Sequence, residues 1–193
     1  MRKFSAISLA VVTSILALAS VALAQKSDDS FANIKIKNFG RMDERFYRGG
    51  QPKEADYKDL AALGVTTVID LQAEPKAYEK ANVEALGMRY VNIPMGDREY
   101  PKLEQVNEFL KLTDDPATGK FYVHCAGGRH RTGVMGAAYR FTRYQWNFEQ
   151  VYAEMKQYDF YTRWGHGKMK DFVEDYWKQI QEKQAATTAS ATR

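Results

Sequence analysis

The chain has a single cysteine, Cys125, among its 193 residues, and only three histidines. One cysteine excludes an intrachain disulfide framework, and with three histidines a structural zinc site would need carboxylate ligands as well. The excess of one sign of charge is also small. The chain has 28 lysines and arginines against 24 aspartates and glutamates, and the resulting net charge of +4 is weak support for a nucleic-acid surface. The hydrophobic fraction of 45% is enough for one compact domain, and the chain is too short for two.

Long hydrophobic runs are confined to the start of the chain. A short basic segment precedes an apolar stretch at residues 7–19, and Ala22-Leu23-Ala24 has the small-x-small form of a cleavage site. We therefore expect a secretory signal peptide over residues 1–24, cleaved after Ala24, and a secreted or periplasmic protein without stable membrane association. The alternative is an uncleaved anchor, because residues 7–24 come near the lower length limit for crossing a bilayer.

Helix and strand patterns alternate through the rest of the chain. Helical spacing of apolar residues predicts helices at residues 53–63, 75–86 and 101–112, and later at 132–144, 148–158 with an Asn147 cap, and 168–183. Apolar runs rich in β-branched and aromatic residues predict strands at 65–71, 88–93 and 121–123. This alternation predicts an α/β fold with a central, mainly parallel sheet flanked by helices. Residues 184–193 lack periodicity and are expected to form a disordered tail.

The segment Val-His-Cys-Ala-Gly-Gly-Arg-His-Arg-Thr-Gly at residues 123–133 joins the last predicted strand to a predicted helix. The N–H groups of a glycine-rich loop and of a helix N-terminus bind tetrahedral oxyanions, and an arginine can hold two phosphate oxygens at once. The same groups lower the pKa of a cysteine at this position, so Cys125 is expected to be a thiolate at neutral pH. The alternative is a strand-to-helix turn that carries a cysteine by chance. The joint spacing of four residues favours the anion-binding loop: Cys125, Gly128, Arg131 and Thr132.

Residues 124–133 have the form His-Cys-x-x-Gly-x-x-Arg-Thr-Gly, which resembles the signature of the cysteine-dependent protein tyrosine and dual-specificity phosphatase superfamily. Residues 47–52, Tyr-Arg-Gly-Gly-Gln-Pro, resemble the opening segment of its small atypical members, and residues 91–97 resemble their general-acid loop. The resemblance runs from about residue 46 to residue 158. The phosphate loop is also similar to that of a fungal and plant atypical group, some of which act on inositol pyrophosphates, and this implies an alternative substrate.

The resemblance implies a role for each matching residue. Cys125 attacks phosphorus and forms a phosphocysteine intermediate, while Asp97 protonates the leaving oxygen and then takes a proton from the hydrolytic water. Thr132 contacts the cysteine sulfur, and His124 braces the loop without touching substrate. The implied phosphate-binding residues are Cys125, Ala126, Gly127, Gly128, Arg129, His130 and Arg131. The resemblance implies no metal and no other cofactor.

Other carboxylates compete with Asp97 for the role of general acid, namely Asp70, Glu99, Asp114 and Asp115. Asp97 is favoured because it matches the family's mobile loop after a strand. Asp114 and Asp115 precede a proline and are expected to form a turn. Asp70 lies in an apolar strand, where it is expected to bind backbone groups or to anchor Arg48.

Several residues near the loop have two interpretations. Arg129 and His130 add positive charge within the loop, and they either project into solvent or favour densely phosphorylated substrates. His166 lies between two glycines and is interpreted as a loop residue. Aromatic residues follow the helix predicted at 148–158, and they are expected to pack in the core rather than to form a substrate wall: Tyr158, Phe160, Tyr161 and Trp164.

The sequence therefore predicts an exported phosphatase domain at residues 25–183 that hydrolyses phosphomonoesters. The phosphorylated substrate is a protein or a small molecule, and no nucleic-acid partner is expected. An inositol polyphosphate or pyrophosphate phosphatase is the first alternative. A non-catalytic phosphate-binding module is the second, although candidates for the nucleophile, the arginine and the acid are all present.

Overall fold

The computed structural model describes residue 31 and residues 33–191. The chain divides into two units, Met1–Ala32 and Asn33–Arg193, and the fold described below lies in the second. The signal peptide expected at residues 1–24 lies outside the described residues. Within the part of the chain that is described, no helix combines the length and the apolar character that a membrane crossing requires.

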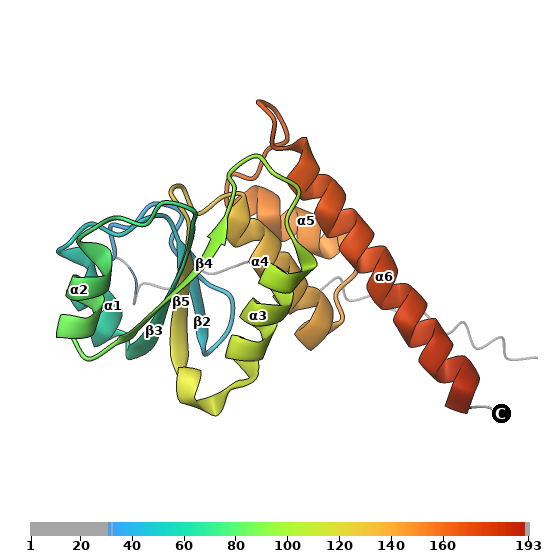
Figure 1. Cartoon of the computed structure of the whole chain (residues 1–193), viewed down its shortest axis with the longest axis horizontal. Helices are drawn as coiled ribbons and strands as arrows, with labels where there is room; N and C mark the ends of the chain where they lie inside the picture. The colour runs from blue at the N-terminus through green and yellow to red at the C-terminus, as the bar shows by residue number, and fades with distance from the viewer. Residues whose placement is uncertain (1–30, 32, 192–193) are drawn as a thin grey trace, which may run out of the picture. The chain divides into compact units, whose positions relative to one another are not determined.

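A five-stranded sheet forms the centre of the second unit (Figure 1). Its strands lie in the order β1-β2-β5-β3-β4, where β1 is antiparallel to β2 and all other neighbours are parallel. The arrangement confirms the predicted mainly parallel sheet. The strands are β1 (Gly40–Arg41), β2 (Phe46–Gly49), β3 (Val65–Gln72), β4 (Arg89–Met95) and β5 (Lys120–His124).

Helices cover both faces of the sheet, as the α/β pattern predicts (Figure 1). One face carries α1 (Asp56–Ala62) and α2 (Glu79–Ala85). The other carries α3 (Leu103–Asp114), α4 (Arg131–Tyr139), α5 (Phe148–Gln157) and α6 (Gly167–Ala191). A 3-10 turn, η2 (Pro116–Thr118), precedes β5, and a π-helical turn, η3 (Arg140–Tyr144), extends α4. The predicted cap of α5 is confirmed, because Oδ1 of Asn147 accepts a hydrogen bond from the amide of Gln150 at 2.9 Å.

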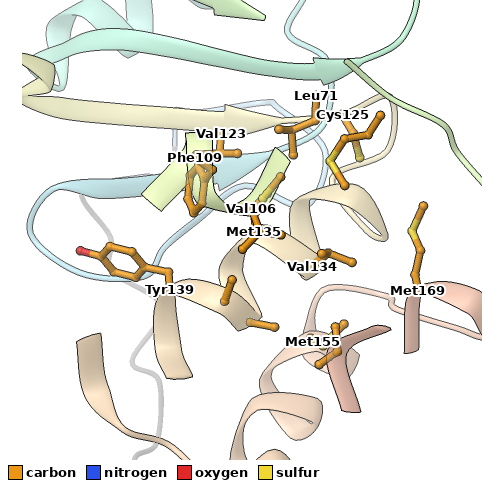
Figure 2. Close-up of a cluster of buried hydrophobic side chains, with 14 of the residues drawn as sticks. Leu71, Val106, Phe109, Val123, Cys125, Val134, Met135, Tyr139, Met155 and Met169 are labelled. Atoms are coloured by element: carbon orange, nitrogen blue, oxygen red, sulfur yellow. The ribbon is translucent and has the colours of Figure 1, made fainter. Parts of the chain in front are cut away.

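The main core lies between the sheet and α4 (Figure 2). Leu71 and Val123 from the strands pack with Val134 and Met135 from the helix, and all four side chains are fully buried. Burial of each such side chain contributes about 1.5–3 kcal/mol. Every residue of α4 is buried, because α3, α5 and α6 all pack against it. This packing fixes the helix whose first turn carries the predicted arginine.

The last helix, α6, is longer than the sequence pattern predicts. The tail expected to be disordered from Gln184 is helical up to Ala191. Alanine and glutamine have high helix propensity, which favours continuation of the helix. The hydroxyls of Thr187 and Thr188 also donate to backbone carbonyls one turn earlier, at 2.9 and 3.0 Å.

Candidate active site

The segment between β5 and α4 forms one wall of a pocket at the carboxyl edge of the parallel strands. It starts at Cys125, directly after β5, and ends where Arg131 begins α4. The pocket is lined by residues from three distant parts of the chain: Asp97, Cys125, Ala126, Gly127, Arg129, His130, Arg131 and His166. Of the predicted site residues, Gly128, Thr132 and His124 lie outside this lining.

Two side chains from other parts of the chain hold the loop backbone by donating hydrogen bonds to its carbonyl groups. Gly127 accepts a hydrogen bond from Nδ2 of Asn38 at 2.8 Å, and Gly128 accepts one from Nη2 of Arg48 at 2.7 Å. Gly128 has a φ of +66°, and a Cβ there would lie 2.4 Å from the carbonyl carbon of Gly49. The loop shape therefore requires glycine at position 128. Because the carbonyls bind the body of the protein, loop N–H groups remain available for the pocket.

Arg48 supports the loop from β2. Its guanidinium carbon lies 3.9 Å from the centre of the Tyr158 ring, in addition to its hydrogen bond to the loop. The expectation that Asp70 anchors Arg48 is wrong, because β5 separates the strands that carry the two residues. The alternative expectation, that Asp70 binds backbone, is confirmed by the amide of Gln72 at 2.9 Å. The packing role predicted for Tyr158 and Phe160 is also confirmed, but it is wrong for Trp164, whose surface is 66% exposed.

Cys125 is almost completely buried, with 3% of its surface exposed. Burial alone would raise the pKa of its thiol. Three kinds of group lower this pKa: the positive charge of Arg131, the hydroxyl of Thr132, and the backbone amides of Thr132 and Gly127. Together they outweigh the effect of burial and hold the pKa of Cys125 below its ordinary value. The thiolate predicted from the loop sequence is therefore consistent with its surroundings.

Arg131 connects the phosphate loop to the end of β4. Its side chain is largely buried, and Nη1 donates a hydrogen bond to the carbonyl of Met95 at 3.1 Å. The guanidinium remains part of the pocket lining. Its other nitrogen atoms are thus available to bind an anion in the pocket, in the paired geometry that a phosphate group favours.

Asp97 follows β4 and reaches the same pocket. Its side chain is 64% exposed and lies 3.9 Å from Nε of Arg98. The competing carboxylates do not line the pocket. Asp115 accepts a hydrogen bond from the amide of Ala117 and caps the turn that the sequence predicts. The turn predicted for Asp114 is wrong, because this residue ends α3 and pairs with Arg143. The other two, Glu99 and Asp70, are likewise absent from the lining.

His124 ends β5 and is completely buried behind the loop. Its Nε2 lies 2.8 Å from Oε1 of Glu79, and its Nδ1 lies 3.9 Å from Oδ1 of Asp70. Burial lowers the pKa of the imidazole, but the two carboxyl groups and Cys125 outweigh burial and raise it above its ordinary value. Its position behind the loop fits a supporting residue.

The same three side chains form a possible metal-ligand set among the described residues, since one ligand atom from each lies within 4.8 Å of the others. However, Asp70 already accepts hydrogen bonds from the amide of Gln72 and from the hydroxyl of Tyr90, at 2.9 and 3.0 Å. The 2.8 Å separation between Nε2 of His124 and Oε1 of Glu79 is that of a close buried ion pair. The group therefore fits a shared proton better than a metal ion.

His166 is a pocket residue that the sequence analysis treated as part of a plain loop. Its ring stacks on the ring of His130, with 3.7 Å between centroids, and Nε2 of His130 lies 3.0 Å from the carbonyl of Tyr161. Burial and the neighbouring His166 lower the pKa of His130 to about 4. His130 is therefore neutral at physiological pH, and of the two expected loop cations only Arg129 carries charge.

Comparison with known proteins identifies the family of this chain. The family model described as "DSP-PTPase phosphatase fused to NAD+ Kinase" matches residues 12–174. The chain belongs to this phosphatase family. It is a cysteine-dependent phosphatase of the tyrosine and dual-specificity class.

Relatives of the phosphatase differ in how much of their length it matches. "Probable tyrosine-protein phosphatase DG1060" of Dictyostelium discoideum is 28% identical over 127 residues, which are 63% of this chain and 75% of that protein. "Inositol diphosphatase DSP1" of Oryza sativa subsp. japonica is 29% identical over 129 residues, 63% of this chain and 56% of that protein. "NAD kinase 2, chloroplastic" of Arabidopsis thaliana is 35% identical over 96 residues, 47% of this chain, but the match covers only 10% of that protein.

Solved structures show the same fold. P. aeruginosa TpbA superposes with a TM-score of 0.65 at 21% identity, and the match covers 77% of this phosphatase and 91% of that chain. The core catalytic domain of the PP-IP phosphatase SIW14 from S. cerevisiae superposes with a TM-score of 0.63 or 0.64 in two structures. In the second, the identity is 19% and the match covers 80% of this chain and 94% of that chain.

Most residues of the pocket were predictable from the sequence, but His166 and Glu79 were not. His166 lines the pocket from the segment before α6, whereas Glu79 of α2 lies outside the pocket, against the buried His124. His166 had only the weak local signal of a histidine between two glycines after an aromatic segment. No local signal singled out Glu79, because its importance depends on the folded position of β5.

Proposed function

We propose that this phosphatase hydrolyses phosphomonoesters through a phosphocysteine intermediate on Cys125. The observation that supports it is the pocket itself. A buried thiol with a lowered pKa faces the same space as Arg131 and as a carboxylate from a separate loop, Asp97. A nucleophile, an anion-binding group and a proton donor are the three components that phosphoryl transfer to cysteine needs.

In the proposed first step, the Cys125 thiolate attacks phosphorus opposite the leaving oxygen. The S–P bond forms as the P–O bond to the leaving group breaks, and Asp97 donates its proton to the departing oxygen. Arg131 and the loop N–H groups bind the three remaining oxygens, where negative charge is concentrated in the transition state. The products are an alcohol or phenol and the phosphocysteine.

In the second step, water attacks the phosphocysteine. Asp97, now a carboxylate, accepts a proton from this water as the new P–O bond forms. The S–P bond breaks, inorganic phosphate is released and Cys125 becomes a thiolate again. Thr132, one of the residues that lower the pKa of Cys125, stabilises the thiolate as a leaving group in this step.

Two substrate classes fit the pocket. A phosphorylated protein side chain needs only the loop and Asp97. An inositol polyphosphate or pyrophosphate is the second candidate, because Arg129 adds a further cation to the lining and a relative is named inositol diphosphatase. A non-catalytic phosphate-binding module is disfavoured, because the nucleophile, the arginine and the acid meet in one pocket.

A phosphate-release screen tests the proposed function. Purified protein is incubated with phosphopeptides, inositol phosphates and pyrophosphates, nucleotides and sugar phosphates, beside a Cys125→Ser variant. We expect release from at least one class, with less than about a hundredth of that turnover in Cys125→Ser, since loss of a nucleophile costs several orders of magnitude. Equal release by both proteins, or binding without release by the wild type, would overturn the proposal.

We also propose that the phosphatase is exported, on the basis of the apolar segment and the small-x-small site in residues 1–24. The protein is expressed in a bacterial host and recovered from periplasmic or culture fractions. An N-terminus at Gln25 in those fractions is the expected result. An intact N-terminus in the membrane fraction would support the uncleaved anchor instead.

A further inference from the structure

We infer that Glu79 is a positioning residue of this phosphatase: its buried carboxylate holds a proton on Nε2 of His124, and the resulting imidazolium favours the thiolate form of Cys125. The inference rests on the proposed role of Cys125 as nucleophile. It adds α2, an element outside the pocket, to the groups that control the reaction.

The first observation is the geometry of the pair. Nε2 of His124 and Oε1 of Glu79 are 2.8 Å apart, and both side chains are completely buried. A carboxylate this close to an imidazole needs a proton on the facing nitrogen, since two acceptors in contact are unfavourable in a buried site. A buried carboxylate without a compensating cation is also unfavourable, and protonation of the imidazole on both nitrogens supplies that cation.

The second observation is the orientation of Glu79. Its other oxygen, Oε2, accepts a hydrogen bond from Nε2 of Gln51 at 3.0 Å, and that amide also lies 3.1 Å from the hydroxyl of Tyr57. Gln51 in turn follows β2 by two residues, and its backbone N–H donates a hydrogen bond to the carbonyl of Ala126 in the loop at 3.3 Å. The carboxylate is therefore fixed by groups that also hold the phosphate loop.

The third observation is the set of charged and titratable groups around the imidazole. Asp70 lies 3.9 Å from Nδ1, and its second oxygen accepts the hydroxyl of Tyr90. The ring of Tyr122 stacks on the imidazole at 5.6 Å between centroids. Groups from three strands and two helices are thus involved: Asp70, Tyr90, Tyr122, Tyr57 and Glu79.

The pKa shifts of Asp70 and Glu79 indicate which of the two carboxyl groups is ionised. Burial and the nearby Glu79 raise the pKa of Asp70 above its ordinary value, although His124 opposes the change. Burial also acts to raise the pKa of Glu79, but its bonds to His124 and Gln51 lower it overall. Glu79 is therefore the carboxylate that stays ionised and retains the histidine proton. A positive charge in the residue adjoining Cys125 then favours the thiolate.

Alkylation of the single cysteine tests this inference without any need for turnover. The rate of iodoacetamide modification is measured against pH for the wild type, Glu79→Gln and Glu84→Gln. Glu84 is the matched control, because it lies on the same helix with an exposed side chain paired to Lys80. We expect the alkylation profile of Glu79→Gln to move to higher pH by about half a unit to one unit, a roughly three- to tenfold lower rate on the acid side. Glu84→Gln should overlay the wild type.

A double variant separates positioning through His124 from a general loss of structure. If Glu79 acts through the imidazole, Glu79→Gln should have no further effect on the alkylation profile in a His124→Gln background. Additive shifts would overturn the inference. So would an unshifted profile in Glu79→Gln, whether or not Cys125→Ser abolishes phosphatase turnover.

NMR of the wild type covers the case in which Glu79→Gln fails to fold. The chain has three histidines, so their ring signals can be assigned and followed against pH. We expect His124 to remain protonated on both nitrogens at pH 7, while His130 loses its proton near pH 4. A neutral His124 at pH 7, or a metal-bound one, would overturn the inference.

Discussion

At the scale of single residues, the reactivity of the pocket depends on contacts that outweigh the effect of burial on pKa. Burial raises the pKa of Cys125 and disfavours its thiolate, but Arg131, Thr132 and backbone amides lower the pKa by a larger amount. The same competition occurs at His124, where the neighbouring carboxyl groups outweigh burial. At His130 no carboxylate intervenes, and the pKa falls to about 4. Neighbouring charge thus decides which of these buried groups is ionised.

Arg131→Lys tests the paired contact with phosphate. A lysine keeps the charge but has no planar fork, and it cannot both reach the carbonyl of Met95 and bind two phosphate oxygens. We expect kcat/KM for p-nitrophenyl phosphate to fall by roughly 10²-fold or more. Arg98→Lys, a change of the same type on an exposed side chain, is the control. Near-normal kinetics in Arg131→Lys would show that the arginine does not bind phosphate in the proposed way.

Asp97→Asn tests the proton donor through the leaving group. An ester with a poor leaving group, such as tyrosine phosphate, should lose roughly 10²- to 10⁴-fold in kcat/KM, the usual contribution of general acid catalysis. An ester with a readily departing phenol should lose much less. Glu99→Gln is the matched control on the same loop. Equal losses for both esters in Asp97→Asn would assign the proton transfer to another group.

At the scale of elements, the phosphate loop takes its shape from β2 as well as from β5 and α4. Gly128 packs against the backbone of Gly49, and Arg48 binds the loop carbonyl from the same strand. The sequence pattern predicted neither β2 nor β1. β2 is short, ends at Gly49 and becomes a strand by pairing with β5 and β1, so its pattern carries no strand signal of its own.

Gly128→Ala and Gly127→Ala form a matched pair that tests this close approach. At position 128 a methyl group would meet backbone atoms at 2.4–2.6 Å and the residue has a φ of +66°, whereas at position 127 the nearest atom is 3.5 Å away. We expect Gly128→Ala to lower the free energy of unfolding by about 1–3 kcal/mol and to impair turnover. Gly127→Ala should stay within about 0.5 kcal/mol of the wild type. Urea denaturation measures both, and equal stabilities would contradict the loop geometry.

The longer elements were predictable because their signals are local. The buried run at β3, the cap of α5 and the apolar spacing of α3 all have their expected types in the structure, with ends shifted by a few residues. The pocket residues on the loop were predictable from one motif. The contributions of Glu79 and His166 were not, because each comes from a segment whose distance from the loop is set only by tertiary packing.

At the scale of the whole molecule, the single cysteine gives the phosphatase a specific chemical sensitivity. A thiolate is the form of cysteine that oxidises, and the chain has no second thiol to convert a sulfenic acid into an internal disulfide. Cys125 lines the same pocket as Asp97, Arg129 and His166, so a reagent that enters the proposed substrate site meets the sulfur.

Mild hydrogen peroxide should therefore inactivate the phosphatase reversibly. Added dithiothreitol should restore activity, and bound inorganic phosphate should slow the inactivation by occupying the pocket. Because the pKa of Cys125 is lowered, inactivation should remain fast below pH 8, where an ordinary thiol is mostly protonated. Mass spectrometry locates the modification. Unchanged activity after treatment, or an unmodified Cys125 in an inactive protein, would contradict an accessible thiolate.

The most direct test of the account is the capture of its covalent intermediate. The phosphatase is mixed with p-nitrophenyl phosphate, quenched in acid during turnover and digested for mass spectrometry, beside the Cys125→Ser variant. The account predicts one phosphoryl group on the peptide that contains Cys125 in the wild type, and none on that peptide in the variant. Continued turnover with unmodified Cys125 at every quench time would contradict the phosphocysteine mechanism.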